Sequence, residues 1–458
     1  MEAVAEIKMQ TSLFAPQWRS LSIGAVALCS MIAFEAIGVA AGMPAVATAL
    51  DGLSLYALAF GGTLAGSVVS MVWSGQACDR HGPFRSMAGG IALFALGLLV
   101  AGLAPSMAAL IASRIVQGLG VGALGVALYV STARALPSAL HPRLFALFST
   151  AWVVPAIVGP AISGWIVEYW GWRWLFLGVA LLLLPVALLI LPTLRETGQS
   201  APGPQRSWRT LPWALLASIS SVGLATAGYA GGWTVPVVFL ALAAAVISAA
   251  RLLPHGTLTL ARGLPTVIAM RGLNSAAFFL CEGFVPLWLH QQAGWSITAA
   301  GLALTGGALC WSLGSQLQSR IDDESLRLSW LSRGSLLIGT GILLCVLSVL
   351  GWIPAITVLI GWSLAGLGMG MSFPILGVLT LKLAPREQQG RYSSAMQLCS
   401  ALGTSGALAL GGLMFSLLQA DRPVLAYSSV YLLAALFALV SWRSAARVGM
   451  GNPPRPSQ

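Results

Sequence analysis

Two glutamates stand near the middle of long apolar runs in this sequence, and no other acidic residue does. They are Glu35 and Glu282. A carboxylate in such a run costs roughly 2.5–3.5 kcal/mol on membrane-insertion scales, so it is treated first as a functional group. A buried carboxyl can hold a proton while closed off and release it when water or a cation approaches. The alternative for Glu35 is a permanently protonated carboxyl that hydrogen-bonds to a neighbouring helix.

Arg114 lies in another apolar run, roughly 13 Å from its end at 1.5 Å per residue. A buried guanidinium needs a partner, and we predict an interaction with Glu35, direct or through Gln117. The alternative is an arginine held by backbone carbonyls as a structural clamp. The run that contains Glu282 also holds Asn274 and Pro286, which could instead form a polar packing site. Arg271, near the end of that run, is expected to extend to the lipid headgroups.

The composition places the chain in a lipid bilayer. Hydrophobic residues make up 57% of it and charged residues 8%, with a mean hydropathy of +0.85. Soluble domains have about 25% charged residues. The net charge of +11 comes from arginines in short loops without a basic stripe, so nucleic-acid binding is not indicated. The six cysteines lack metal-ligand spacing, and we expect neither a disulfide framework, a metal site nor a cofactor.

Fourteen stretches are long and apolar enough to cross a membrane as helices, at about 20 residues each. The first begins after a charged segment, lacks a clear cleavage site, and is expected to be retained. The predicted spans are 21–46, 53–74, 86–104, 106–133, 143–169, 173–194, 211–230, 233–253, 264–290, 297–319, 329–350, 353–383, 391–419 and 424–444.

The basic residues test this count, because cytoplasmic loops retain Lys and Arg. Of the 24, 20 fall on the side that holds both termini, while Arg173 and Arg422 fall on the other side and Arg114 and Arg271 lie within spans. Merging spans seven and eight, which only Gly231 and Gly232 separate, would move about half of these charges outside. We therefore predict a multi-pass protein of a bacterial cytoplasmic (inner) membrane, with both termini cytoplasmic.

The segmentation gives an order of domains. We predict a cytoplasmic N-terminal segment (1–20), a six-helix bundle (21–194), a Pro- and Gly-rich cytoplasmic linker (195–210), an inserted two-helix hairpin (211–253), a second six-helix bundle (264–447) and a cytoplasmic tail (448–458).

The two bundles carry an internal repeat. The segment 117–122 (QGLGVG) is echoed by 365–370 (AGLGMG) at an offset of 248, and Glu35 by Glu282 at an offset of 247. A fainter echo relates Gly75 to Gly314 at an offset of 239. Duplicated bundles commonly bind substrate and coupling ion between their halves, near the midplane. Both glutamates are expected to face that interface.

Three motifs resemble those of the major facilitator superfamily. The loop after span two, GQACDRHGPFR from Gly75 to Arg85, resembles the family's G-x-L-x-D-R-x-G-R signature, with Ala77 in place of Leu and the last basic residue displaced. The segment 114–118 (RIVQG) is similar to its R-x-x-Q-G motif. The segment 159–164 (GPAISG) is similar to the antiporter motif G-P-x-x-G-G, with Ser163 in place of a glycine.

With fourteen spans, the chain resembles the fourteen-helix drug:proton antiporter branch. The resemblance implies an all-α polytopic membrane protein with the major facilitator fold, namely two six-helix bundles plus two additional helices between them. It also implies a conformational switch. The residues expected to form that switch are Gly75, Asp79, Arg80, Gly82, Arg85, Pro155, Gly159, Pro160 and Gly164.

The remaining candidates concern ligand binding. We predict proton coupling by Glu35, Glu282 and Arg114. Substrate contact is predicted for Glu35, Glu282, Phe34, Gln117, Tyr129, Trp152, Asn274, Phe278 and Trp311, whose aromatic members could line an apolar cavity.

No ATP-binding loop and no hydrolase or metalloprotease motif is present, so an enzyme is not indicated. The sequence favours a proton-coupled exporter of hydrophobic or cationic drugs or toxic metabolites that works by alternating access. It is expected to be monomeric, with a small-molecule substrate, protons and lipid as its only partners. Open alternatives are an exporter of a siderophore or lipid, a proton-coupled metabolite importer, and a membrane sensor that does not transport.

Overall fold

The structure is a computed structural model that describes residues 12–52, 56–196, 210–226, 231–295, 297–321 and 323–448. Over these residues it holds α-helices and short 3₁₀ turns. Most of the predicted linker, the first residues of the N-terminal segment and nearly all of the C-terminal tail lie outside the described ranges.

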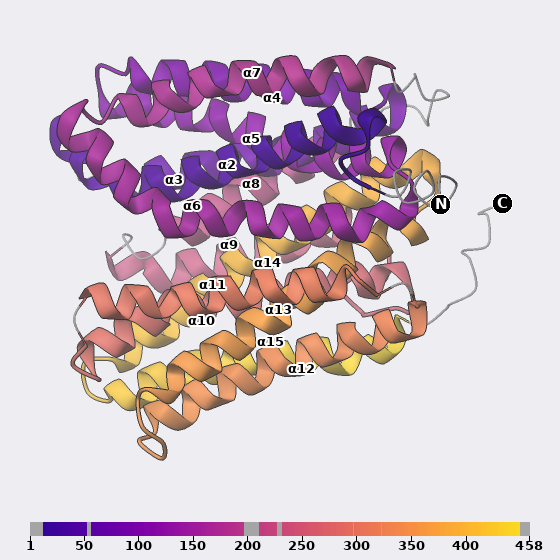
Figure 1. The fold of residues 1–458 in the computed structure, drawn as a ribbon. Coiled ribbons are helices and arrows are strands. Elements are labelled where there is room, and N and C mark those ends of the chain that lie inside the picture. Colours follow the sequence, from indigo (N-terminus) through magenta and orange to yellow (C-terminus); the bar gives the residue numbers. More distant parts are fainter. Residues whose placement is uncertain are drawn as a thin grey trace. The chain divides into compact units, whose positions relative to one another are not determined.

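Internal packing divides the chain into two units. Unit 1 comprises 1–248 and 386–398, and unit 2 comprises 249–385 and 399–458. The helices of unit 1 are coloured indigo to pink in Figure 1 and are α2 (Pro16–Ala49), α3 (Tyr56–His81), α4 (Pro83–Gly102), α5 (Met107–Ala135), α6 (His141–Tyr169), α7 (Trp174–Glu196), α8 (Leu211–Thr226) and most of α9 (Thr234–Leu252). Those that follow are α10 (Leu264–Gln291), α11 (Ile297–Gln318), α12 (Glu324–Val349), α13 (Thr357–Leu383), α14 (Gln389–Leu418) and α15 (Pro423–Ser444). The first turns of α14 belong to unit 1.

These segments are helical because a chain in hydrocarbon must satisfy its backbone polar groups internally. The helix starts are marked in the sequence. Pro83 and Pro423 open α4 and α15, where the missing N–H costs nothing. The Ser106 hydroxyl accepts the N–H of Ala109 at 3.3 Å at the start of α5, and the Asp323 carboxylate accepts the N–H of Ser325 at 2.8 Å at the start of α12.

Each of the fourteen predicted spans coincides with one helix in the described residues, and a short 3₁₀ turn at Gly231–Trp233 precedes α9. Among these helices, eleven stretches are long and apolar enough to cross a membrane. Helix α8 is apolar but shorter, and α3 and α11 are not among the eleven. The chain is therefore a multi-pass membrane protein, and the full count of fourteen crossings remains a prediction.

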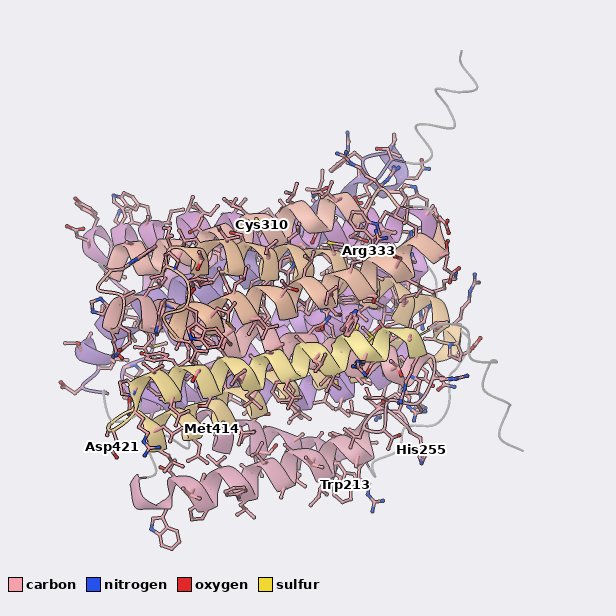
Figure 2. All side chains as sticks on the ribbon, turned by 90° about the horizontal axis from the view of Figure 1, so that it is seen from below. Trp213, His255, Cys310, Arg333, Met414 and Asp421 are labelled. Atoms are coloured by element: carbon pink, nitrogen blue, oxygen red, sulfur yellow. The ribbon has the colours of Figure 1, made fainter. Side chains whose placement is uncertain are left out.

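The packing within each unit follows the same plan. In unit 1, α5 packs against α3 and α4, and α2 packs against α6 and α7. In unit 2, α13 packs against α11 and α12, and α10 packs against α15. Asp421, in the turn between α14 and α15, and His255, in the turn after α9, lie at opposite ends of unit 2 (Figure 2).

Glycine contacts confirm the internal repeat and fix its register. A Cβ on Gly118 or Gly122 of α5 would collide with the carbonyl oxygens of Thr63 and Ser67 of α3. A Cβ on Gly366 or Gly370 of α13 would collide with those of Gly307 and Trp311 of α11. The glycines are offset by 248 and their partners by 244.

This register corrects one of the three sequence echoes. At an offset of 244, the counterpart of Gly75 is Ser319, so the proposed match to Gly314 is out of register by five residues. The sequence similarity between these two segments is too weak to set their alignment. The packing of α3 on the glycines of α5, and of α11 on those of α13, sets it.

Candidate functional site

The Arg114 guanidinium forms an ion pair with the Glu35 carboxylate inside unit 1, as the sequence predicts. Helix α2 supplies Glu35 and α5 supplies Arg114, with exposed fractions of 2% and 3%. At such burial an isolated charge would be very costly, and the pairing offsets much of that cost.

Further hydrogen bonds fix the orientation of this pair. Arg114 Nε donates to the carbonyl of Ala59 at 3.3 Å, and Arg114 also donates to Gln117 Oε1 at 2.5 Å. Gln117 Nε2 donates to the carbonyl of Gly97 at 3.1 Å. Four helices, α2 to α5, are therefore linked through the hydrogen bonds of Arg114 and Gln117. A proton arriving at Glu35 would release the guanidinium and disturb the contacts of all four.

Glu282 of α10, in unit 2, has a different environment. It is partly buried, and none of the residues that the structure describes forms an ion pair or hydrogen bond with it. The neighbouring Gly283 faces Leu408 of α14, at 3.5 Å from a built Cβ. The two glutamates thus share a place in the sequence repeat but differ in their partners.

Asn274 lies two turns before Glu282 and is fully buried. Its Nδ2 donates to the hydroxyls of Ser335 at 3.4 Å and Ser372 at 3.2 Å, and Ser335 lies 3.3 Å from Ser441. A substrate could reach Asn274 only after these hydrogen bonds had opened. The same holds for Gln117, which is also 0% exposed. Substrate contact by either amide remains a prediction.

The aromatic candidates fall into two groups. In unit 1, Tyr129 stacks on Phe145 with ring centroids 4.8 Å apart, and Trp152 is 43% exposed. Phe34, also in unit 1, is partly buried one residue before Glu35. In unit 2, Phe278 lies edge-on to Trp311 at 5.1 Å.

Arg271 does not extend to the headgroups, and that expectation is wrong. Its side chain is 3% exposed, its guanidinium lies over the ring of Phe373 at 3.1 Å, and Nη1 donates to the Phe373 carbonyl at 2.8 Å. The position of Arg271 near the start of α10 had suggested that its guanidinium could reach the membrane surface. The cation–π contact with α13, which the sequence does not show, holds the residue inside.

A second cluster lies where α3 ends in unit 1. The Asp79 carboxylate accepts the backbone N–H of Gly390 at 2.6 Å and that of Arg391 at 2.8 Å, in the first turn of α14. The first N–H groups of a helix have no partner within it, so Asp79 acts as a cap supplied by another helix. Burial raises the pKa of the Asp79 carboxyl to about 6, against the lowering effect of the two N–H donors and of Arg134 and Arg391.

Gly75 and Gly82 have separate structural duties in this segment. A Cβ on Gly75 would lie 2.6 Å from Cβ of Ser394 and 2.8 Å from the oxygen of Gly390. Gly82 has φ of 78°, the left-handed conformation that ends α3 and lets α4 begin at once. Arg80 and Arg85 are exposed beside them.

The glycines of the α6 motif make no close helix contacts among the described residues. A Cβ on Gly159 would make an ordinary contact with Ile37 at 3.6 Å, and one on Gly164 would meet no described atom within 4 Å. The close approach of α2 and α6 lies instead at Gly38, whose built Cβ falls 2.5 Å from Oγ of Ser163. Pro155 and Pro160 lie within the uninterrupted helix.

Several residues of these clusters had no signal of their own in the sequence. Gly390 and Arg391 lie over 300 residues after Asp79, and Gly97 and Ala59 contribute only backbone oxygens. The Gly-Arg pair at the start of α14 is the one sequence pattern that could have indicated the partners of Asp79.

Comparison with known proteins agrees with this architecture. The family model described as Major Facilitator Superfamily matches residues 23–403 and 267–457. The chain belongs to the major facilitator superfamily. The superfamily relatives named below are transporters rather than enzymes.

Relatives from Mycobacterium tuberculosis include superfamily members with drug-related names. One, named "Probable multidrug-efflux transporter", is 25% identical over 447 residues, which is 93% of either chain. Another, "Multidrug resistance protein Stp", is 26% identical over 371 residues, covering 78% of this chain and 68% of its own. An uncharacterized MFS-type transporter is 23% identical over 366 residues; the match covers 77% of this chain but only 53% of that relative.

Solved structures of the superfamily share the fold. The human organic anion transporter MFSD10 superposes with a TM-score of 0.67 at 15% identity, covering 92% of this chain and 99% of its own. A bacterial homologue of the iron transporter ferroportin, in an outward-facing state, gives 0.68 at 12% identity, covering 94% and 98%. At such identities the likeness concerns the fold alone.

Proposed function

We propose that the chain is a proton-coupled exporter of hydrophobic or cationic drugs or toxic metabolites, working by alternating access. The observation that carries the proposal is the buried Arg114–Glu35 pair with its Gln117 contact. A carboxylate at 2% exposure that is neutralised by one guanidinium is a site where a proton can replace the guanidinium's charge. The name of one relative, a probable multidrug-efflux transporter, supports the direction, and that of another, a multidrug resistance protein, supports the substrate class.

The coupling step follows from this geometry. With Glu35 ionised, Arg114 is held to α2 and the four helices of the cluster are joined. When Glu35 takes up a proton, the ion pair loses its attraction, and Arg114 is left to Gln117 and the Ala59 carbonyl. Proton binding would thus change the relative stability of two arrangements of these helices, as coupling requires. Glu282 is the second proposed proton- and substrate-binding acid.

The Asp79 cap is the proposed conformational switch, together with Gly75, Gly82, Arg80 and Arg85. Asp79 and Gly75 hold the first turn of α14, and α14 continues into unit 2. Alternating access would require this contact to form in one state and open in the other. The motif of α6, from Pro155 to Gly164, is proposed to bend during the same change.

We propose the membrane arrangement predicted from the sequence. It has fourteen crossings, six-helix bundles at 21–194 and 264–447, and both termini on the cytoplasmic side of a bacterial inner membrane in a monomer. The position of Asp421 and His255 at opposite ends of unit 2 supports alternate sides for these two turns.

Flux into proteoliposomes with an imposed pH gradient tests the function. Purified protein is assayed with lipophilic cations, neutral drugs, siderophores and lipids, with and without an ionophore that collapses the gradient. We expect accumulation of at least one lipophilic drug that stops on addition of the ionophore. Gradient-independent flux of every compound, or binding without flux, would contradict the proposal.

A further inference from the structure

Ser163 of α6 carries a buried hydroxyl that has no hydrogen-bond partner among the residues that the structure describes. The residue is 0% exposed. A serine inside a helix can satisfy its hydroxyl by donating to the carbonyl four residues earlier. Ser149 of the same helix does so, to the carbonyl of Phe145 at 3.2 Å. Ser163 does not, and a buried polar group without a partner calls for an explanation.

The Ser163 hydroxyl faces α2 at the turn that carries Glu35. A Cβ built on Gly38 lies 2.5 Å from Oγ of Ser163, so the missing side chain of Gly38 leaves the space in which the hydroxyl lies. Residues three apart on a helix are neighbours on its surface, with Cβ atoms about 5–6 Å apart. Rotation of the Glu35 side chain can therefore bring its carboxyl within hydrogen-bond distance of the hydroxyl.

The ring of Phe34 borders the same space. It lies 3.5 Å from a Cβ built on Gly38 and 3.8 Å from one built on Gly159, one turn before Ser163 on α6. The hydroxyl is thus a polar point in an apolar contact between α2 and α6. A hydrogen bond formed in such surroundings is stronger than one in water.

Arg114 is the charged side chain that faces Glu35 in the described part of unit 1. The other acidic, basic and histidine residues on the helices packed on α2 stand near the ends of those helices. They are Arg134 on α5, His141, Arg143 and Glu168 on α6, and Arg195 and Glu196 on α7. The proton equilibrium of Glu35 therefore depends on Arg114 and on the hydrogen bonds that its carboxyl can form.

Protonation changes the kind of partner that Glu35 needs. An ionised carboxylate only accepts hydrogen bonds, whereas a protonated carboxyl carries an O–H that needs an acceptor. Arg114 cannot serve this form, because a guanidinium has donors and no acceptor. The oxygen of Gln117 already accepts from Arg114. The Ser163 hydroxyl has acceptor lone pairs and lies next to the same turn of α2.

We propose that Ser163 is a positioning residue that accepts a hydrogen bond from the protonated Glu35 carboxyl. A proton binds a carboxylate oxygen of Glu35, the ion pair with Arg114 breaks, and the new O–H donates to Oγ of Ser163. Glu35 thereby exchanges its link to α5 for a link to α6. This inference rests on the proposed proton coupling and names the residue that receives the protonated carboxyl.

Infrared difference spectra of the purified protein in lipid, between pH 4 and pH 9, test this contact without any transport. The band of the protonated Glu35 carboxyl is identified by its loss in Glu35→Gln. We expect Ser163→Ala to move this band to higher wavenumber, because the C=O bond stiffens when the O–H loses its acceptor. Ser149→Ala is the matched control on α6 and should leave the band in place, because the Ser149 hydroxyl is bound within its own helix.

A double variant separates the hydroxyl from the volume that it fills. Ser163→Gly with Gly38→Ala places a methyl group where the hydroxyl was, since the built Cβ of residue 38 falls 2.5 Å from Oγ. We expect the same band shift as in Ser163→Ala. The pH of half-maximal drug accumulation should also fall by about 0.5 unit or more, the effect of losing one ordinary hydrogen bond to the protonated form. Ser163→Ala carries the test if the double variant fails to fold.

The outcomes separate the inference from the proposed function. An unmoved Glu35 band in Ser163→Ala, or a double variant with the parent spectrum and pH profile, would overturn the role of Ser163. The band itself and gradient-driven flux would still uphold Glu35 as the proton carrier. If no Glu35-dependent band exists between pH 4 and pH 9, the proton carrier is contradicted, and the inference with it.

Discussion

Gly75 and Gly390 touch backbone to backbone, and neither has room for a methyl group. A Cβ on Gly390 would collide with the carbonyl oxygen of Gly75 and lie 2.8 Å from Oδ1 of Asp79. The absence of both side chains brings the first turn of α14 within hydrogen-bond reach of Asp79. The hydrogen bonds to Asp79 therefore depend on the close contact between Gly75 and Gly390.

Gly390→Ala should break the hydrogen bonds between Asp79 and the first turn of α14 while leaving α14 helical. Alanine favours a helix more than glycine does, so a loss must come from the collision with Gly75. We expect the amides of residues 390 and 391 to lose at least tenfold of their protection in hydrogen–deuterium exchange, since first-turn amides have no intrahelical acceptor. Gly412→Ala is the matched control on the same helix, because no described atom lies within 4 Å of its built Cβ. Unchanged protection in Gly390→Ala would contradict the contact.

The Asp79 contact should depend on pH with a defined sign. The pKa of Asp79 is about 6 in the contact, above the ordinary value of 3.8 for an exposed aspartate. The capped state therefore binds the proton more tightly, gains stability as the pH falls toward 4, and loses it as the pH rises through 6. Amide protection at Gly390, divided by the intrinsic exchange rate at each pH, should be greater at pH 5 than at pH 7.5. Asp79→Ala should abolish the difference, and a trend of opposite sign would refute the assignment.

Removing Arg114 alone should be more damaging than removing it together with the Glu35 charge. Arg114→Met leaves a buried carboxylate without its cation, a change that costs about 3–5 kcal/mol in comparable pairs. Adding Glu35→Gln should recover most of that loss, as measured by unfolding in detergent. Lys382→Met breaks the exposed pair with Glu324 and is expected to cost less than about 1 kcal/mol. Additive effects of Arg114→Met and Glu35→Gln would show that the pair is not energetically coupled.

The helices and the first ion pair could be predicted from the sequence because their signals are local or chemically compelling. The lengths of the apolar runs predicted the positions of the helices. Arg114 and Glu35 were predicted to pair because a buried charge needs an opposite charge beside it. The partner of Asp79 could not be predicted, because it consists of backbone amides more than 300 residues away. The burial of Arg271 depends on the ring of Phe373, which no spacing rule relates to it. The contrast between Glu35 and Glu282 could not be predicted either, because both lie in similar apolar runs and differ in the partners that the fold brings to them.

Comparison of driven transport with exchange in Glu35→Gln proteoliposomes tests the coupling most directly. The parent protein should accumulate its drug substrate against a concentration gradient when a pH gradient is imposed. Glu35→Gln should lose this accumulation and still exchange labelled for unlabelled substrate across the membrane. Accumulation by Glu35→Gln at the parent rate and with the parent pH dependence would contradict the role of Glu35 as the proton carrier.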